Sequence, residues 1–321
     1  MSQTGIVIVT HNSEPEIGPC LDAALATGAQ VVVVDNASQD ATLEEVLLRP
    51  AVRLIANPWN RGFAAAANQG IGAIDCACVL LLNPDAVLLG GLAALASACR
   101  QPGVAAAGGK LVDERGRPQT GFMVRRFPSA LSLTFEMFGL NRLWPANPVN
   151  RRYRCLDLDA EVPAEVEQPA GAFLMVRRGV WQELGGFDES FHPLWFEDVD
   201  FLKRARDLGC RVLYVPAAAA RHLGGRSVGR LPWERRRVYW YDSLLSYAAR
   251  HFRPLSLGMT CAAAMLASVA RMGEGILRVS PRPFWVYSRV FRLAGRRLIL
   301  GRREERVFAS AFSARQQSSG G

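Results

Sequence analysis

One short apolar run, Cys78–Leu82, constrains the fold of this chain more than any other segment, because Asn83-Pro84-Asp85 follows it directly. A continuous apolar run of this length is typical of a strand that is buried on both faces. Proline has no N–H to give to a sheet and disfavours helix in the residue before it, so the strand is expected to end here. We therefore expect Asp85 at the carboxyl end of a central strand, where open α/β sheets bind their ligands. A carboxylate there suits Mg²⁺ or Mn²⁺ shared with a diphosphate, and a simple turn aspartate is the alternative interpretation.

Similar strand patterns alternate with helical segments along the first part of the chain. Strands are expected at residues 5–10, 31–34 and 52–56, with a helix to about residue 27 and a helix of small residues at 64–70. Later strands are expected near residues 104–109, 168–176 and 211–215. This alternation predicts an α/β fold with a doubly wound, mostly parallel central sheet. No GxGxxG motif follows the first strand, which disfavours a dinucleotide-dependent oxidoreductase.

Polar residues follow the expected strands and mark a candidate binding edge. Asp35 ends the second strand and is placed to accept hydrogen bonds from a base or a ribose. Capping of the next helix is the alternative, although Ser38 or Asp40 is better placed for it. Arg61 precedes the helix of small residues and is placed to neutralise a diphosphate, with a solvated arginine as the alternative.

Three acids, Glu197, Asp198 and Asp200, lie at the start of an expected helix at 197–208, directly behind Trp195. One acid at a helix N-terminus is explained by the helix dipole, but three are not. A carboxylate beside aromatic side chains suits a general base that activates a sugar hydroxyl. Trp195 either stacks on a sugar ring or belongs to the core. His222 follows one helix and one strand later and can complete a metal site, with a structural histidine as the alternative.

Charge divides the chain into two parts. Residues 226–306 hold 17 Arg and 5 Asp or Glu, a net charge of +12, whereas residues 1–225 hold 20 Lys or Arg and 24 acids, a net charge of −4. A basic module of this kind predicts an anionic partner, either a membrane surface or a nucleic acid. The seven scattered cysteines contain no CxxC pair, which favours a reducing cytoplasm over structural zinc. Residues 1–5 are polar and a strand pattern follows at once, so no cleavable signal segment is expected.

The basic module has the pattern of amphipathic helices. Residues 233–252 and 284–303 alternate apolar side chains with arginine at roughly helical spacing, a pattern that favours an anionic membrane surface. Residues 254–270 are uncharged but shorter than the roughly 20 apolar residues of a membrane span. The alternative is a set of helices packed on the catalytic domain with solvated arginines.

Five motifs in this order resemble the inverting family-two glycosyltransferases of the GT-A fold, and most closely their bacterial rhamnosyltransferase branch. The resemblance covers roughly residues 5–230. The motifs are Val7 with Thr10-His11-Asn12-Ser13, Val34-Asp35-Asn36-Ala37-Ser38, Asn60 and Gly62-Phe63-Ala64 with Asn68-Gln69-Gly70, Asn83-Pro84-Asp85, and Phe196-Glu197-Asp198-Val199-Asp200.

The resemblance implies a role for each motif residue and a divalent cofactor, Mg²⁺ or Mn²⁺. It makes Asp198 the catalytic base, with acceptor contacts from Trp195, Glu197 and Asp200, and it makes Asp85 and His222 metal ligands. Asn83 stands where the family's DxD motif has its first aspartate, so one carboxylate of that motif remains. The nucleotide-sugar contacts that it implies, together with basic side chains placed near the diphosphate, are Thr10, Asn12, Asp35, Asn36, Arg61, Asn68, Asn83 and Arg226.

The resemblance over residues 5–230 and the basic pattern after them predict a domain organisation. We expect a GT-A domain at residues 1–230, with a nucleotide-binding half at about 1–110 and an acceptor half at about 111–230. A basic amphipathic helical region follows at 231–313, and residues 314–321 form a disordered tail.

The activity implied is transfer of a sugar with inversion, best interpreted as L-rhamnose from dTDP-rhamnose to a saccharide or a polyprenyl-diphosphate-linked glycan in cell-surface polysaccharide synthesis. Such an enzyme would be cytoplasmic and peripheral on the inner face of the cell membrane. Mannosyl, galactofuranosyl or N-acetylhexosaminyl transfer from a GDP- or UDP-sugar is the alternative. A non-catalytic nucleotide-sugar-binding protein is disfavoured by the intact Asp85 and Asp198. A nucleic-acid partner is not expected, because no nucleic-acid-binding module is recognisable.

Overall fold

The computed structural model describes residues 4–224, 229–277 and 280–300 of the 321-residue chain. The chain forms two compact units. The first, here the sheet unit, comprises residues 1–127 and 151–231, and the second, here the helical unit, comprises residues 128–150 and 232–321. The boundary expected after residue 230 lies beside Leu231. Residues 128–150, which we expected within the first domain, group instead with the C-terminal helices.

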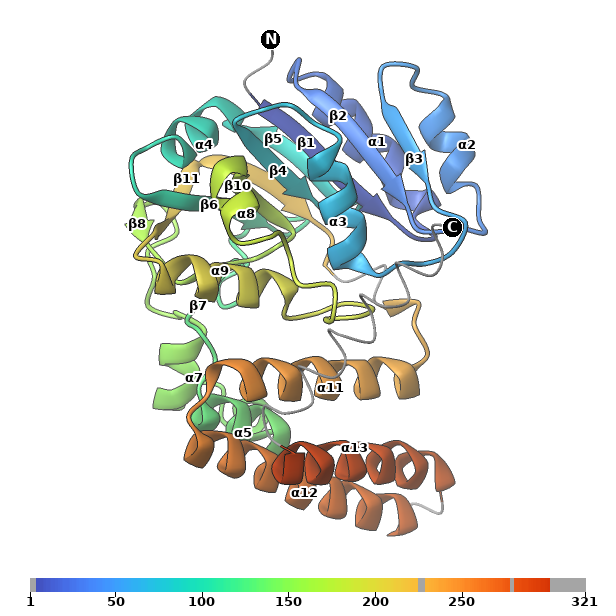
Figure 1. The fold of residues 1–321 in the computed structure, drawn as a ribbon, viewed down its shortest axis with the longest axis vertical. Helices are drawn as coiled ribbons and strands as arrows, with labels where there is room; N and C mark the ends of the chain where they lie inside the picture. Colours follow the sequence, from blue (N-terminus) through green and yellow to red (C-terminus); the bar gives the residue numbers. More distant parts are fainter. Residues whose placement is uncertain (1–3, 225–228, 278–279, 301–321) are drawn as a thin grey trace. The chain divides into compact units, whose positions relative to one another are not determined.

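The sheet unit is built on a nine-stranded sheet with the order β3-β2-β1-β4-β10-β6-β11-β5, in which β8 also pairs with β11 (Figure 1). A two-stranded sheet, β7 with β9, lies in the same unit. The strands are β1 (Thr4–Thr10), β2 (Gln30–Asp35), β3 (Arg53–Ala56), β4 (Cys78–Leu82), β5 (Ala86–Gly90), β6 (Val104–Val112), β7 (Val124–Arg125), β8 (Ala164–Glu165), β9 (Gln168–Pro169), β10 (Phe173–Arg177) and β11 (Arg211–His222).

Most of the described strands of the large sheet run in one direction. β1, β2, β3 and β4 are parallel neighbours, and β6 is parallel to β11. β10 lies antiparallel between β4 and β6, while β5 and β8 are antiparallel to β11. The predicted α/β class with a mostly parallel central sheet is therefore confirmed, and β10 is the antiparallel strand that joins its two parallel halves.

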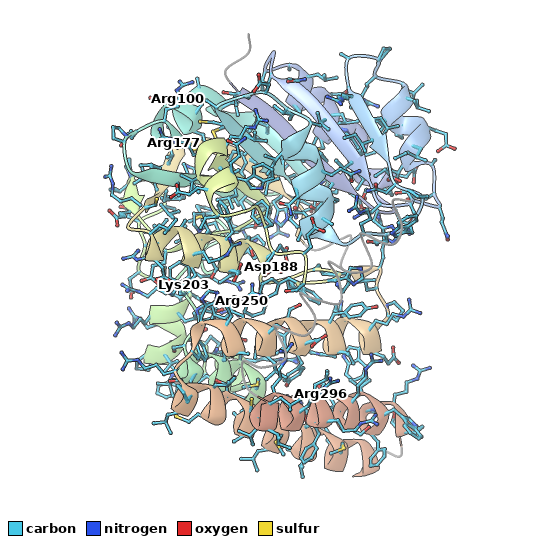
Figure 2. The ribbon with its side chains drawn as sticks, viewed as in Figure 1. Arg100, Arg177, Asp188, Lys203, Arg250 and Arg296 are labelled. Atoms are coloured by element: carbon cyan, nitrogen blue, oxygen red, sulfur yellow. The ribbon has the colours of Figure 1, made fainter. Side chains whose placement is uncertain are left out.

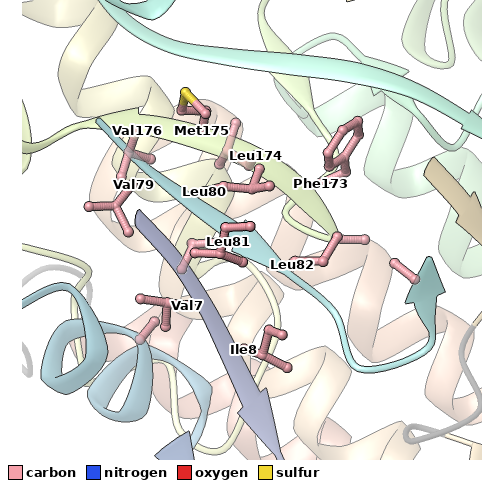
Figure 3. Packing of buried hydrophobic residues seen from close by; sticks show 14 of the residues in the cluster. Val7, Ile8, Val79, Leu80, Leu81, Leu82, Phe173, Leu174, Met175 and Val176 are labelled. Carbon is pink, nitrogen blue, oxygen red and sulfur yellow. The ribbon is translucent and has the colours of Figure 1, made fainter. Parts of the chain in front are cut away.

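The central strands carry the core of the sheet unit. All five residues of β4 are buried, as the apolar run predicts. Side chains of β1, β4 and β10 pack together there, among them Val7, Leu81 and Leu174, which are neighbours in the strand register (Figure 3). Strand β4 ends at Leu82, and a tight turn follows in which the Ala86 N–H donates to the Asn83 carbonyl at 3.0 Å. This turn leads straight into β5, a short strand that the sequence did not predict.

Among the described residues, six helices belong wholly to the sheet unit: α1 (Glu14–Leu25), α2 (Thr42–Leu47), α3 (Phe63–Gly72), α4 (Leu92–Cys99), α8 (Arg178–Glu183) and α9 (Glu197–Asp207). Small residues let α3 lie close to the sheet, as predicted. A Cβ on Gly70 would be only 2.5 Å from a methyl carbon of Val7 in β1. Any larger residue there would push α3 off the strand.

The helical unit contains α5 (Ala130–Phe138), α6 (Leu140–Leu143), α11 (Trp233–His251), α12 (Pro254–Leu277) and α13 (Pro281–Leu300), while α7 (Pro148–Tyr153) crosses the boundary between the units. Helix α12 packs against α5, α11 and α13. The helix predicted at 233–252 is present as α11. The helix predicted at 284–303 corresponds to α13, and its last residues, 301–303, lie outside the described residues. The predicted tail at 314–321 lies outside the described residues. Among the described residues, one helix is long and apolar enough to cross a membrane, at Pro254–Gly275.

Candidate active site

Asp35 ties together the ends of the first two strands. The Thr10 hydroxyl donates to Asp35 Oδ1 at 2.7 Å, and the Ser38 N–H donates to Asp35 Oδ2 at 2.9 Å. The Ser38 hydroxyl in turn accepts the Asn12 N–H at 2.8 Å. The structure thus brings the predicted residues Thr10, Asn12 and Asp35 to one edge of the sheet. The side chains of Thr10 and Asp35 are fully buried, so they shape this edge from within.

Asn36 connects this edge to the start of α3. Its backbone N–H donates to the Thr10 carbonyl at 2.8 Å, and its side-chain amide donates to the Gly62 carbonyl at 3.1 Å. Asn36 Oδ1 accepts the Asn57 amide at 3.1 Å and the backbone N–H of Arg61 at 3.4 Å. Arg61, which is half-buried, is therefore held at the same edge as Asn36.

Asn68 holds the loop that follows α8. Asn68 Oδ1 accepts the Phe187 N–H at 2.8 Å and the Trp181 indole N–H at 3.1 Å, and its amide donates to the Phe187 carbonyl at 2.8 Å. Gly186 passes so close that a Cβ there would lie 2.7 Å from Asn68 Oδ1. The polar atoms of Asn68 are thus engaged within the protein, and a direct contact with the nucleotide sugar stays a prediction.

Asp85 and His222 come together although 136 residues separate them in the sequence. Asp85 follows β4 and His222 ends β11, and Asp85 Oδ1 lies 3.5 Å from His222 Nε2. Both side chains are buried, and His222 Nε2 has no hydrogen-bond partner among the described residues. A carboxylate oxygen beside an unpartnered imidazole nitrogen is a donor pair that suits a divalent cation.

The surroundings of this pair leave the remaining coordination positions to other ligands. Among the described residues, no group of three or more His, Cys, Asp or Glu side chains could hold a metal. A cation at Asp85 and His222 would therefore need oxygens from water or from a bound diphosphate, as Mg²⁺ and Mn²⁺ commonly do.

A cavity of about 310 Å³ opens beside Asp85. Glu16 lines the cavity and lies in α1, and the Arg230 guanidinium donates to both of its carboxyl oxygens at 2.8 and 2.9 Å. Sequence reasoning missed Glu16 and Arg230, since 213 residues separate them and neither belongs to a recognisable motif. The residues that line the cavity are Pro15, Glu16, Pro19, Asp85, Val87, Glu114, Arg221 and Leu223.

Asp198 is positioned at the start of α9 by two backbone amides. Asp198 Oδ1 accepts the Val199 N–H at 2.8 Å, and Asp198 Oδ2 accepts the Gly171 N–H at 3.0 Å. The residue after Gly171 is Ala172, whose carbonyl accepts the Asn83 N–H at 3.0 Å. This short chain of contacts places Asp198 and the Asn83-Pro84-Asp85 turn at the same end of the sheet.

The backbone before α9 adopts an uncommon conformation. Trp195 and Phe196 have φ values of +76° and +70°, in the left-handed region that non-glycine residues seldom occupy. Two such residues in succession turn the chain sharply into the helix, and strained backbone of this kind concentrates at functional sites. Trp195 is half-buried.

The other two acids differ in their partners. Asp200 is fully buried and accepts the Arg204 guanidinium at 2.7 Å, and Arg204 also donates to the carbonyls of Leu184 and Gly186. Asp200 therefore anchors the loop at 184–186 through Arg204, while an acceptor contact stays a prediction. Glu197 is buried too, but its Oε2 has no hydrogen-bond partner among the described residues.

Burial dominates the electrostatics of this acidic group. Burial, and then the neighbouring charge of Asp198, raise the pKa of Glu197 well above its usual range. Burial also raises the pKa of Asp198, although hydrogen bonds from Val199 and Gly171 and the charge of Arg125 oppose the shift. Arg226, the remaining predicted contact of the nucleotide sugar, lies outside the described residues.

Comparison with known proteins identifies the family. The sequence profile of Glycosyl transferase family 2 matches residues 5–180, more than half of the chain. The chain belongs to glycosyltransferase family 2. It is therefore a glycosyltransferase, and the resemblance predicted from the five motifs is confirmed. The profile match includes Asp35 and Asp85 but ends before Asp198 and His222, which the structure places at the same end of the sheet as Asp85.

Two curated relatives of this family-2 enzyme are informative. The chain is 30% identical over 265 residues to the N-acetylglucosaminyl-diphospho-decaprenol L-rhamnosyltransferase of Mycobacterium tuberculosis, a match that covers 77% of this chain and 84% of that protein. It is 40% identical over 84 residues to the succinoglycan biosynthesis protein ExoO of Rhizobium meliloti, covering 25% of this chain and 24% of that protein.

Solved structures agree with the family-2 fold. The mannosyltransferase PcManGT from Pyrobaculum calidifontis, in complex with GDP-Man and Mn²⁺, superimposes with a TM-score of 0.51 at 17% identity, covering 92% of this chain and 87% of that chain. GalNAc-T7 with UDP, GalNAc and Mn²⁺ gives a TM-score of 0.50 at 16% identity, covering 77% and 51%. These similarities support the GT-A fold.

The raised pKa of Glu197 predicts how stability depends on pH. Between the ordinary glutamate pKa of 4.5 and the higher folded pKa, the unfolded chain ionises Glu197 while the folded chain resists, so the free energy of unfolding falls as pH rises. Glu197→Gln removes this contribution. We expect the free energy of unfolding of the variant, relative to that of the native protein, to be higher at pH 8 than at pH 4.5. Urea unfolding of both proteins at both pH values measures this difference.

The matched control is Glu183→Gln, which changes an exposed glutamate of α8. Its stability difference from the native protein is expected to stay flat over the same pH range. Parallel pH profiles for Glu197→Gln and the native protein would contradict the burial of a carboxyl group at this position.

Proposed function

We propose that this glycosyltransferase transfers L-rhamnose from dTDP-rhamnose, with inversion, to a polyprenyl-diphosphate-linked saccharide in cell-surface polysaccharide synthesis. The approach of Asp85 Oδ1 to His222 Nε2, at the end of the sheet that also holds Asp198, is the observation that carries the chemistry. The sugar and the acceptor are supported by the mycobacterial relative, which aligns with 77% of the chain.

Asp198 is the proposed general base. An inverting transfer needs one base that removes the proton of the acceptor hydroxyl while this oxygen attacks the anomeric carbon from the side opposite the diphosphate. The carboxylate of Asp198 has its orientation fixed by the N–H groups of Gly171 and Val199. Both donors favour the ionised form, which is the form that accepts a proton.

Asp85 and His222 are the proposed ligands of a divalent cation. Their separation of 3.5 Å and the unpartnered His222 Nε2 fit two donors to one ion. When bound, such a cation supplies positive charge that stabilises the departing diphosphate. A mixed oxygen and nitrogen donor pair favours Mn²⁺ over Mg²⁺. Asn83 contributes no carboxylate, so Asp85 and His222 are the two proposed protein ligands.

The nucleotide pocket is proposed at the edge formed by Thr10, Asn12, Asp35 and Asn36. Their hydrogen bonds to one another hold this edge in a fixed shape before a ligand arrives, which lowers the entropy cost of binding. Arg61 enters the same region from the start of α3 and carries the positive charge that a diphosphate needs.

The proposed place of action is the cytoplasmic face of the cell membrane, with the enzyme attached peripherally. The net charge of +12 on residues 226–306 supports an anionic surface as partner, and a lipid-linked acceptor would be found there. A nucleic acid is not proposed as a partner.

Nucleotide binding tests the donor site. We expect titration calorimetry to show that dTDP binds more tightly than UDP or GDP, and more tightly with Mn²⁺ than without. In Asp85→Asn, the increase in dTDP affinity that Mn²⁺ produces should fall by at least about tenfold. Loss of a residue that only supports a metal ligand already costs about that much affinity, so loss of a ligand should cost no less. The control is Asp113→Asn, which changes an acid that pairs with Arg117 in an exposed turn. Tighter binding of UDP or GDP would contradict the choice of sugar, and absence of nucleotide binding would contradict the site.

Asp198→Asn tests the base. The amide oxygen can still accept the Gly171 N–H, but it cannot take up a proton, so kcat should fall by about 10²- to 10⁴-fold. The Kd of dTDP-rhamnose should stay unchanged. Transfer is measured to N-acetylglucosaminyl-diphospho-polyprenol, with Asp207→Asn, an exposed change at the end of α9, as the control. A native kcat for Asp198→Asn would show that another group is the base.

A further inference from the structure

The helical unit exposes an unbroken apolar stripe along α12. The stripe consists of Leu255, Met259, Ala262, Leu266 and Val269, and the four large side chains are between 51% and 78% exposed. Their spacing of alternately four and three residues places them on one face of the helix. No charged residue occurs between Pro254 and Ala270. We call this face the α12 stripe.

The opposite face of α12 is packed inside the helical unit. Cys261, Ala264 and Ala267 are buried there, where α12 meets α5, α11 and α13. The hydroxyls of Thr260 and Ser268 donate to the carbonyls of Ser256 and Ala264 within the helix, so this face carries no unsatisfied hydroxyl. The α12 stripe is thus the face that no described helix of the unit covers.

Helix α13 runs antiparallel to α12 and carries exposed charge. A Cβ on Gly275 would lie 3.0 Å from Pro283, and a Cβ on Gly258 would lie 3.9 Å from Leu298. Exposed arginines of α13 are Arg282, Arg289, Arg292 and Arg296, of which Arg296 is labelled in Figure 2. Burying these arginines in hydrocarbon would be costly, so α12 cannot cross a bilayer while α13 packs along it.

Apolar side chains at both ends of α13 are also exposed. Phe284 and Trp285 are 45% and 71% exposed, and Leu298 and Ile299 are 47% and 83% exposed. An apolar helix face flanked by aromatic residues and arginines is the pattern of helices that lie in the plane of a membrane surface.

We propose that the α12 stripe inserts in-plane into an anionic lipid bilayer, with the arginines of α13 contacting lipid phosphates. The proposal rests on the proposed function, because a lipid-linked acceptor requires the enzyme to work at such a surface. Apolar burial provides the attachment, and the arginines select anionic lipid.

The test is co-sedimentation of the full chain with vesicles of phosphatidylglycerol and phosphatidylcholine in equal amounts, and with phosphatidylcholine alone. We expect binding to the anionic vesicles and at least about tenfold weaker binding for Leu266→Glu with Val269→Glu. The matched control is Leu47→Glu with Leu48→Glu, which changes two apolar residues of similar exposure, 67% and 72%, at α2. Calorimetric dTDP binding, measured without vesicles, tests the proposed function separately.

Three results would overturn the proposal. One is native vesicle binding by the α12 stripe variant. Another is a protein that resists alkaline carbonate and leaves native membranes only in detergent, which would mean that α12 crosses the bilayer. The third is a dimer in solution that the substitutions dissociate while vesicles bind neither form, which would assign the stripe to a second copy of the chain.

A different observation concerns Gln119, whose side-chain amide contacts His222 at two points. Gln119 Nε2 donates to the His222 carbonyl at 2.8 Å, and Gln119 Oε1 lies 3.1 Å from His222 Nδ1. Because the NH₂ group is engaged with a carbonyl, the amide oxygen must face the ring. An amide oxygen only accepts, so Nδ1 must carry the ring proton.

In the neutral imidazole the second ring nitrogen then holds a lone pair. His222 Nε2 is buried, has no hydrogen-bond partner among the described residues and faces Asp85 Oδ1 at 3.5 Å. Phe122 stacks on the ring at 5.1 Å with an angle of 10° between the planes, which fixes its orientation. Two acceptors that face each other in a buried site repel unless a cation lies between them.

We infer that Gln119 is a positioning residue, which holds His222 in the Nδ1–H tautomer and presents the Nε2 lone pair beside Asp85 to a divalent cation. The inference rests on the metal site proposed above. Partners of this kind orient metal-binding histidines and set their tautomer.

Nitrogen-15 NMR of the metal-free, histidine-labelled protein at pH 8 reads the tautomer directly, with His222 assigned from a His222→Gln variant. We expect Nδ1–H in the native protein and a mixture in Gln119→Met, with about 10- to 100-fold weaker Mn²⁺ binding by calorimetry. Gln119→Glu, which can still accept the Nδ1 proton, should keep the native tautomer.

An Nε2–H tautomer in the native protein would overturn the role of Gln119. So would a Gln119→Met variant that keeps both the native tautomer and the native Mn²⁺ affinity. If the native protein binds no Mn²⁺, the metal site fails, while the tautomer comparison still decides what Gln119 does.

Discussion

The insertion of β10 between β4 and β6 is the constraint on which the rest of the active site depends. The hydrogen bond from the Asn83 N–H to the Ala172 carbonyl continues this pairing past the end of β4. It fixes the Asn83-Pro84-Asp85 turn against the residues that precede β10. Asp198 binds the neighbouring Gly171 N–H, so the proposed base and the proposed metal ligand share one stretch of backbone as their support. Backbone hydrogen bonds between buried strands are stiff, and they give the site a geometry that flexible side chains alone could not hold.

The buried carboxyl groups around the site differ in their hydrogen-bond partners. Asp35 and Asp200 are fully buried and well partnered, the first by hydroxyl and amide donors and the second by Arg204. Glu197 is buried with a carboxyl oxygen that lacks a hydrogen-bond partner among the described residues, and its pKa is raised accordingly. A partnered buried acid stabilises local structure, whereas an unpartnered one costs stability. Glu197 is therefore the residue whose presence the fold alone does not explain, which is consistent with a role toward a bound molecule.

Local sequence signals predicted much of the sheet unit. Proline in Asn83-Pro84-Asp85 marked the end of β4, and small residues marked the close approach of α3 to β1. β5 was missed because its five residues follow the turn without any polar spacer. The end of β11 was missed because a run of alanines has low strand propensity, yet pairing with β6 and β5 on either side holds it extended.

The candidate site was predicted less completely, because long-range contacts decide the partners of a side chain. The sequence analysis assigned Asp85 and His222 to one metal site, and the structure places them 3.5 Å apart, but nothing local pointed to Gln119, which is a polar residue in a turn. Asn68 and Asp200 belong to family motifs, while the structure shows their polar atoms engaged with Phe187 and Arg204. Likewise, residues 128–150 join the helical unit through packing of α5 on α12, for which no composition signal exists.

The placement of residues 128–150 in the helical unit affects how the chain folds during its synthesis. Leu133 and Met137 of α5 are almost fully buried in the helical unit, yet the helix that packs on α5, α12, begins more than 100 residues later. During translation, α5 leaves the ribosome well before α12 exists, and its apolar face stays without its partner until residues 254–277 emerge. The sheet unit cannot be released as an independent product by stopping the chain after Leu231, since that shorter chain would keep the uncovered face of α5 in its middle. The helical unit therefore cannot be completed until residues 151–231 of the sheet unit, which lie between its two segments in the chain, have been synthesised.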